Sequence, residues 1–221
     1  FNKPIQKLRE AVEEEKLGRI MNGTARILWR RDDNYYKQAP WRGTWDLDGG
    51  TLMNQCIHNI DLMQWMIGSE VERVYAECDT YRNNIEGEDF GAILVRFKNG
   101  AIGIIEGSAV VYPKNLEETL SIFGTQGTVV IGGLAVNELK TWRFEGEDEE
   151  AVKAGLQVEI DSVYGEGHTP LIRDVIYAIN EDRKPYVSGE DAIVPLSIIL
   201  AAYKSRKTGM NFNILLKKRQ N

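Results

Sequence analysis

Apolar residues recur at helical spacing in two stretches of the first third of the chain. The first predicted helix runs from about Pro4 to Leu17, where the apolar positions follow an i, i+3, i+4 stripe, and Gly18 is placed to end it. The second follows Thr51 and ends at Gly68. A helix therefore stands on either side of the segment from about 19 to 50.

A pair of helices is predicted near the end of the chain. Thr169-Pro170 fits an N-cap followed by proline at the first helical position, and Pro185 ends that helix. Ser188 and Asp191 resemble a capping box for the next helix, which stops at Gly209. One stripe of the first helix in this pair is apolar: Leu171, Val175, Ile176 and Ile179.

Between these helices the pattern changes to that of strands, rich in β-branched and aromatic residues. Asn99-Gly100 is a two-residue hairpin signal, which favours antiparallel neighbours. The chain is therefore predicted to be α+β, with a large, mostly antiparallel open sheet, helices packed on one face, and the other face free to meet a partner. The predicted strands are Val71–Tyr81, Phe90–Lys98, Ala101–Val111, Glu118–Phe123, Thr128–Ile131 and Lys140–Phe144.

Composition narrows the class of protein. Of 221 residues, 43% are hydrophobic and 27% charged, which is typical of a globular protein. The net charge of −6 without a long basic run argues against nucleic acid or an anionic membrane as a partner. No apolar run is long enough to predict a membrane span. Because the chain begins at Phe1 rather than Met, we expect an upstream segment to have been removed.

Cysteine and histidine are scarce. Cys56 and Cys78 fit no zinc-binding spacing, and His58 and His168 are too few for a metal site, so no metal and a reduced, cytoplasmic compartment are predicted. The acidic run Glu86 to Asp89 is interpreted as a turn with edge charge. A GxGxxG motif, a Walker A loop and a GxSxG motif are all missing, so the chain by itself is not expected to hold a dinucleotide in the usual way.

The stretch from Trp41 to Asp61 carries the candidate chemistry. Gly49-Gly50 allows a ligand to approach the backbone closely, or a tight helix entry. On a helix, Asn54, His58 and Asp61 share one side because they are four and three residues apart. An imidazole beside an amide is suited to removing a hydroxyl proton while a donor holds the oxygen, as oxidation of an alcohol requires. A single histidine on a half-apolar helix is alternatively a structural residue.

Other side chains of this region are candidates for binding a substrate. Asp61 is predicted to orient a neighbouring group rather than to act as the base. Four aromatic residues would stack on the apolar faces of a sugar, or serve as core or interface residues: Tyr35, Tyr36, Trp41 and Trp45. Three cations would hold a phosphate or carboxylate, or are surface charges: Arg31, Lys37 and Arg42. His168, just before a helix, is interpreted as a turn residue.

Several of these residues stand in the order of a family signature. Asp48-Gly-Gly50, Asn54, His58 and Asp61, followed by Trp65 and Gly68, resemble the GGG…H-x-x-D…W-x-G signature of the Gfo/Idh/MocA oxidoreductases, the relatives of glucose-fructose oxidoreductase and inositol dehydrogenase. The resemblance covers most of the chain. It includes the strand, Asn-Gly turn and strand from Phe90 to Ile105, and the Gly-Thr-x-Gly turn within Ser121–Thr128.

The resemblance implies that residues 1–221 are a C-terminal substrate-binding and oligomerisation domain, like the C-terminal domain of glyceraldehyde-3-phosphate dehydrogenase. An N-terminal Rossmann domain that binds NAD or NADP would lie upstream, outside this chain. A homodimer or homotetramer would form through the sheet face. His58 matches the family's catalytic histidine. Asn54 stands where several members have aspartate, and an amide cannot act as a base, so it would position substrate.

The loop Trp41 to Trp45, with Asn54-Gln55 before the histidine, is most similar to the branch of the family that oxidises UDP-N-acetyl-glucosaminuronate at the 3-hydroxyl. The predicted function is therefore NAD(P)-dependent oxidation of a sugar, cyclic polyol or sugar nucleotide, to which this chain alone contributes no turnover. The alternative is a non-catalytic binding or assembly module on the same fold.

Overall fold

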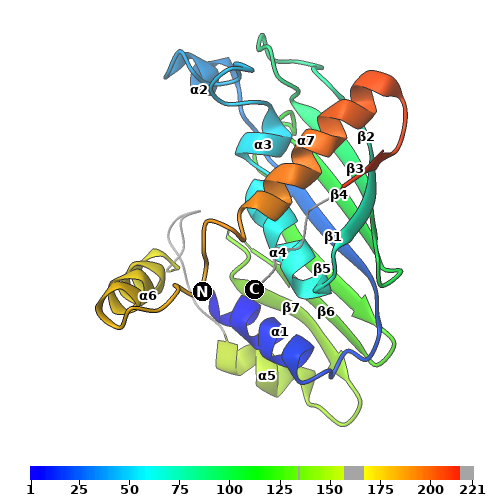
Figure 1. The fold of residues 1–221 in the computed structure, drawn as a ribbon, viewed down its shortest axis with the longest axis vertical. Helices are drawn as coiled ribbons and strands as arrows, with labels where there is room; N and C mark the ends of the chain where they lie inside the picture. The colour runs from blue at the N-terminus through cyan, green and yellow to red at the C-terminus, as the bar shows by residue number, and fades with distance from the viewer. Residues whose placement is uncertain (134, 157–166, 215–221) are drawn as a thin grey trace.

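The computed structural model describes residues 1–133, 135–156 and 167–214, and its centre is a single open sheet (Figure 1). The strand order is β7-β6-β5-β1-β4-β3-β2-β8. Neighbouring strands are antiparallel except β1 and β4, which are parallel. The strands are β1 (Ile20–Leu28), β2 (Val71–Asp79), β3 (Phe90–Phe97), β4 (Ile102–Ser108), β5 (Glu117–Gly124), β6 (Gly127–Gly132), β7 (Glu138–Phe144) and β8 (Phe212–Asn213).

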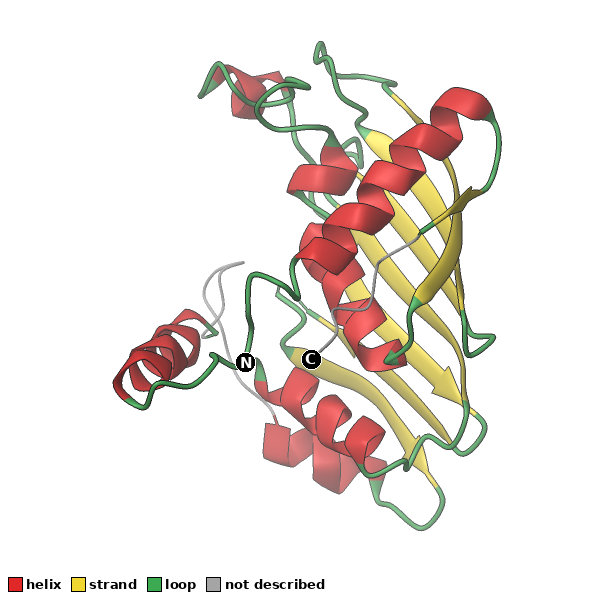
Figure 2. Cartoon of the chain, viewed as in Figure 1, coloured by secondary structure: helices red, strands yellow, loops and turns green. Residues whose placement is uncertain are grey.

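Most of the helices lie against one face of this sheet, as Figure 2 shows, so the predicted α+β architecture is confirmed. Burial of apolar side chains from α4 and α7 against the strands builds the core, which includes Met63, Ile198 and Phe97. None of the described helices is both long and apolar enough to cross a membrane. The helices are α1 (Lys3–Glu13), α2 (Asp33–Lys37), α3 (Thr51–Asn54), α4 (Ile57–Ile67), α5 (Glu149–Leu156), α6 (His168–Asn180) and α7 (Ile193–Thr208).

Strand β1 was not predicted, although it lies in the middle of the sheet. Its inward positions include Gly23 and Ala25, which are buried but too small to mark an apolar alternation in the sequence. The small side chains are required by packing, because a Cβ on Gly23 would stand 3.1 Å from atoms of Met63, Ile67 and Ile122. The helix α4 therefore approaches β1 more closely than larger residues would allow.

The predicted helix from Thr51 to Gly68 is in fact two helices, α3 and α4, so the prediction of one continuous helix was wrong. The amides of Gln55 and Cys56 both donate to the Thr51 carbonyl, at 2.9 and 3.1 Å, which widens the turn between the helices. Gly68 ends α4 in the left-handed conformation at φ 64°, as predicted. Asn54 and His58 consequently belong to different helices.

The remaining helix ends agree with the sequence in part. Helix α1 stops at Glu13 rather than Leu17, because the chain turns through Glu15, at φ 57°, before reaching Gly18. Ser188 and Asp191 do pair, since the Ser188 Oγ donates to the Asp191 carboxylate at 2.7 Å, although α7 begins only at Ile193.

Helix α6 stands to the side of the sheet and its other helices (Figure 1). It begins at His168, so Thr169-Pro170 lies in its first turn. Most of its apolar stripe is exposed, including Val175, Ile176 and Ile179. The described part of the chain therefore leaves an amphipathic helix largely uncovered.

Candidate active site

A cavity of about 670 Å³ opens beside the end of β1, between α3, α4, β5 and the start of α6. Such a volume is in the range of small-molecule sites. Among the predicted site residues, five side chains line it: His58, Asn54, Arg31, Arg42 and Tyr35. Residues far apart in the sequence therefore meet at one cavity.

The structure places the other predicted residues elsewhere. Tyr36 lines a neighbouring hollow together with Lys37. Trp41 is exposed. Asp61 is half-buried on α4 and accepts a hydrogen bond from Gln64 Nε2 at 3.0 Å. The loop from 33 to 45 thus divides its aromatic side chains between the cavity and other surroundings.

Asn54 is held by its neighbours on α3 and the preceding loop. Its Nδ2 donates to Asp48 Oδ1, and the other Asp48 oxygen accepts the Gly43 amide at 2.6 Å. The Gln55 Nε2 donates both to Asn54 Oδ1 and to the Tyr35 hydroxyl. This network fixes the amide of Asn54 at the wall of the cavity, as an orienting role requires.

Two guanidinium groups flank Tyr35 at the same wall. The Arg42 guanidinium lies 4.1 Å from the Tyr35 ring centroid, and that of Arg31 lies 5.1 Å from it. Each Nε is buried without a hydrogen-bond partner within the described residues. Buried donors are normally satisfied, so these two atoms indicate that the cavity suits an oxygen-rich, anionic ligand.

The His58 side chain is exposed on α4 and reaches the cavity. Burial raises the pKa of Asp61, one turn further along the helix, and the nearby His58 imidazole partly offsets that rise. The imidazole is thus open to a ligand in the cavity. This arrangement suits a group that accepts a proton from a bound hydroxyl.

The acidic segment before β3 differs from the prediction of an edge turn, because Glu88 and Asp89 are 3% and 0% exposed. The Asp89 carboxylate accepts three backbone amides, those of residues 81–83. The Glu88 Oε1 accepts the Leu52 amide at 2.7 Å and the Tyr203 hydroxyl at 3.2 Å. Glu88 therefore fixes the start of α3, the helix that ends with Asn54.

Burial raises the pKa of Glu88 to about 7, and its hydrogen bonds only partly oppose this. A folded-state pKa above the unfolded value stabilises the fold below the unfolded pKa, and this contribution is lost as the pH rises through about 7. Wild-type melting temperature should therefore fall between about pH 5 and about pH 8, and Glu88→Gln should reduce that fall.

Glu118 shares the direction of this effect, so part of the pH dependence should persist in the Glu88→Gln variant. The matched control is Glu106→Gln, which alters an outward-facing partner of Arg26. Equal pH slopes for the wild type and Glu88→Gln would contradict the assignment to Glu88.

Sequence reasoning missed two residues of the cavity, Glu118 on β5 and Asn59, which follows His58 on α4. Glu118 and Asn59 both line the cavity and are nearly buried. One signal was available in the sequence, because Glu118 is in phase with the inward residues Leu120 and Ile122 of the same strand. Among the described residues, no cluster of three or more His, Cys, Asp or Glu side chains could hold a metal ion.

The chain is thus an α+β domain in which a histidine, an amide and two guanidinium groups line one cavity. The model of the GFO/IDH/MocA C-terminal domain matches residues 5–130, and the chain belongs to this family. The resemblance seen in the sequence is thereby confirmed.

Relatives with solved structures are similar over nearly the whole chain. The WlbA dehydrogenase from Bordetella pertussis, in complex with NADH and UDP-GlcNAcA, is 36% identical with a TM-score of 0.90, over 98% of this chain and 62% of that one. WlbA from Chromobacterium violaceum, in the same kind of complex, is 35% identical with a TM-score of 0.87, over 98% and 61%.

A more distant relative is a curated enzyme. Myo-inositol 2-dehydrogenase of Thermotoga maritima is 24% identical over 212 residues, which are 93% of this chain and 59% of that protein. The chain thus spans about three-fifths of the length of the relatives that it matches.

Proposed function

We propose that this chain is the substrate-binding part of an NAD(P)-dependent dehydrogenase that oxidises a ring hydroxyl of a sugar nucleotide bearing a carboxylate, with UDP-N-acetyl-glucosaminuronate as the preferred candidate. The observation that carries the proposal is the cavity that brings His58 together with the buried, unpaired Nε atoms of Arg31 and Arg42. Similarity to WlbA, whose structures hold NADH and UDP-GlcNAcA, supports the choice of substrate.

The cavity residues have separate roles in the proposed reaction. Arg31 and Arg42 bind the carboxylate or the diphosphate, and Asn54 orients the sugar. His58 accepts the proton of the reacting hydroxyl as its oxygen becomes the carbonyl oxygen of the product. A bound nicotinamide supplies the acceptor for the hydride that leaves the same carbon. One proton and one hydride thus leave the alcohol.

The cofactor, NAD or NADP, is proposed to bind mainly to a Rossmann domain outside residues 1–221, so that this chain alone has no turnover. Two observations support a missing wall. The chain spans about three-fifths of its relatives, and helix α6 exposes the apolar residues Ile172 and Ile176 beside the cavity-lining His168.

A cytoplasmic location is part of the same proposal. Both cysteines, Cys56 and Cys78, are buried free thiols, which suits a reducing compartment. The net charge of −6 favours a small-molecule partner over nucleic acid.

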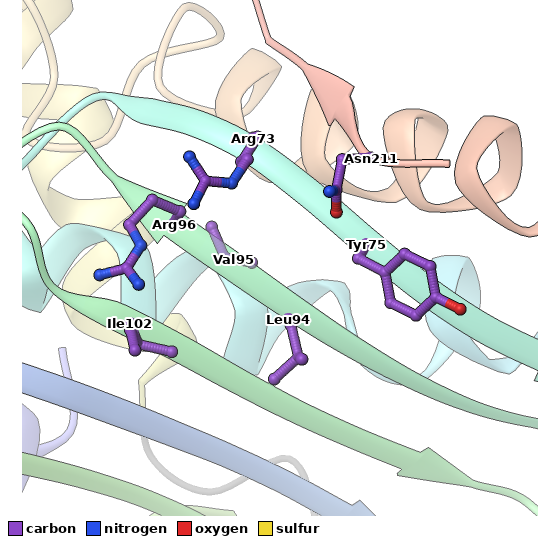
Figure 3. A pocket seen from close by; sticks show the side chains of 7 residues that line it. All are labelled: Arg73, Tyr75, Leu94, Val95, Arg96, Ile102 and Asn211. Atoms are coloured by element: carbon purple, nitrogen blue, oxygen red, sulfur yellow. The ribbon is translucent and has the colours of Figure 1, made fainter. Parts of the chain in front are cut away.

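We also propose that the uncovered sheet face pairs with a second copy of the chain to form a dimer or tetramer. Leu94 on β3 lies opposite Tyr75 on β2 and Ile104 on β4, so an apolar row crosses three strands. Figure 3 shows Leu94, Tyr75 and Ile102 projecting from this face beside Arg73 and Arg96. An apolar centre with arginine near it is the composition of a subunit interface.

Leu94→Glu is expected to lower the mass measured by light scattering from that of the oligomer to that of one chain. The side chain is 52% exposed in the single chain, so folding should be little affected. Leu116→Glu, at an exposed position just before β5, should leave the mass unchanged. A wild-type mass of one chain would contradict the pairing.

The proposed function is tested by supplying the full-length protein with NAD⁺ or NADP⁺ and three substrates in turn. UDP-N-acetyl-glucosaminuronate should reduce the nicotinamide. UDP-N-acetylglucosamine, which lacks the carboxylate, and myo-inositol should do so poorly. Turnover of myo-inositol without turnover of the uronate would overturn the substrate class. Failure of all three would favour a non-catalytic binding module.

A further inference from the structure

A buried acid and a buried amide line the same cavity, and no cation among the described residues pairs with the acid. Glu118, on β5, is 9% exposed, and Asn59, next to His58 on α4, is 1% exposed. Both side chains line the cavity. They come from elements on opposite sides of the α4–β5 contact, so the fold has brought them together from distant parts of the chain.

Among the described residues, neither side chain has the full set of partners that a buried polar group requires. Burial raises the pKa of Glu118 to about 7, and Asn59 alone opposes the rise among the described groups. The Asn59 Nδ2 is buried and has no well-formed hydrogen bond within the described residues. A buried carboxyl without a cation and a buried N–H without an acceptor each destabilise a fold.

The neighbouring acid shows that this burial is not a general property of the strand. Glu117 points to the opposite face of the sheet, where its carboxylate accepts hydrogen bonds from Arg26 Nη1 at 3.0 and 3.3 Å. Glu118 instead faces α4. Groups kept at a cost in stability are typical of binding sites.

We infer that Asn59 and Glu118 form a donor–acceptor pair that binds one ring hydroxyl of the substrate, next to the hydroxyl whose proton passes to His58. A hydroxyl oxygen can accept the Asn59 N–H while its own hydrogen is donated to a Glu118 oxygen. No single-function group, such as an ether or a methyl, satisfies both. The pair therefore selects substrates with a free hydroxyl beside the oxidised position.

The inference rests on the proposed function, and the experiment separates the two. Full-length wild-type protein and three variants, Glu118→Ala, Glu118→Gln and Glu117→Gln, are assayed with UDP-N-acetyl-glucosaminuronate for KM and kcat. The ligand-free melting temperature of each is recorded alongside.

Glu118→Ala should raise KM about 10- to 100-fold, the loss of a hydrogen bond to a charged or strongly polar group. Glu118→Gln should raise it less, because the amide keeps an acceptor oxygen. Both variants should melt at or above the wild-type temperature, since a buried, poorly paired acid is gone. Glu117→Gln should leave KM unchanged.

If the wild type turns over and Glu118→Ala has the same KM, the inference is overturned and the proposed function stands. Lower melting temperatures in both Glu118 variants with unchanged KM would assign the pair a structural role only. A wild type that neither turns over nor binds the uronate by calorimetry overturns the proposed substrate, and the inference with it.

Discussion

Replacing His58 by alanine is expected to reduce kcat by roughly 10²- to 10⁴-fold, the usual contribution of a positioned general base. The side chain is exposed at the cavity, so its removal takes little from the core, and the melting temperature should stay near that of the wild type. Steady-state assays of nicotinamide reduction by the full-length protein measure this loss of kcat.

His168→Ala is the matched control, because His168 is the second histidine on the cavity and is also exposed. Its loss should reduce kcat far less than the loss of His58, since it lies at the start of α6 rather than beside Asn54. The reverse ranking would assign the base to His168, and equal activity in both variants would leave the proposed chemistry without a base.

The second large effect is expected on stability, from Gly50→Ala. A Cβ at this position would stand 1.8 Å from Glu88 Oε2 and 2.1 Å from Glu88 Cδ. The carboxyl group cannot swing aside freely, because the Leu52 amide and the Tyr203 hydroxyl hold its other oxygen. We expect a loss of about 3 kcal/mol in the free energy of unfolding, seen as a clear drop in melting temperature.

Two further variants serve as controls for this result. Gly155→Ala, where an added Cβ meets nothing within 4 Å, should melt at or slightly above the wild-type temperature because alanine favours a helix. The double variant Gly50→Ala, Glu88→Ala should lose less stability than the two single losses added together, because the clash has been removed. If the losses of stability in the two single variants add up to that of the double variant, the clash with Glu88 is not the cause of the Gly50→Ala effect.

Sequence patterns predicted the strands β2 to β7 and the helix ends at Gly68 and Gly209, because these depend on local chemistry. Gly68 and Gly209 both end helices in the left-handed conformation that glycine adopts readily. Strand β1 escaped notice because its partners, not its own residues, make it a strand. Its inward Gly23 reflects the close approach of α4, which no local pattern reports.

The site residues that the sequence predicted also depend on local patterns, and those that it missed depend on distant contacts. His58 and Asn54 were found because a loop and a helix start carry them within a short stretch of sequence. Glu88 was misjudged because its burial depends on Tyr203, 115 residues away. Glu118 was overlooked because an acid on a strand is usually solvated, and only the packing of α4 against β5 shows which face it occupies.

The central place of β1 also bears on how the chain reaches its fold. Asn22 on β1 lies opposite Ile102 on β4 and Phe123 on β5, so the middle of the sheet closes about 80 to 100 residues after its first strand is made. Until β4 is made, β1 has no neighbouring strand, and until β5 is made, one backbone edge of β1 stays open. Synthesis thus passes through an interval in which the central strand exists without its partners, and aggregation competes most strongly with folding there.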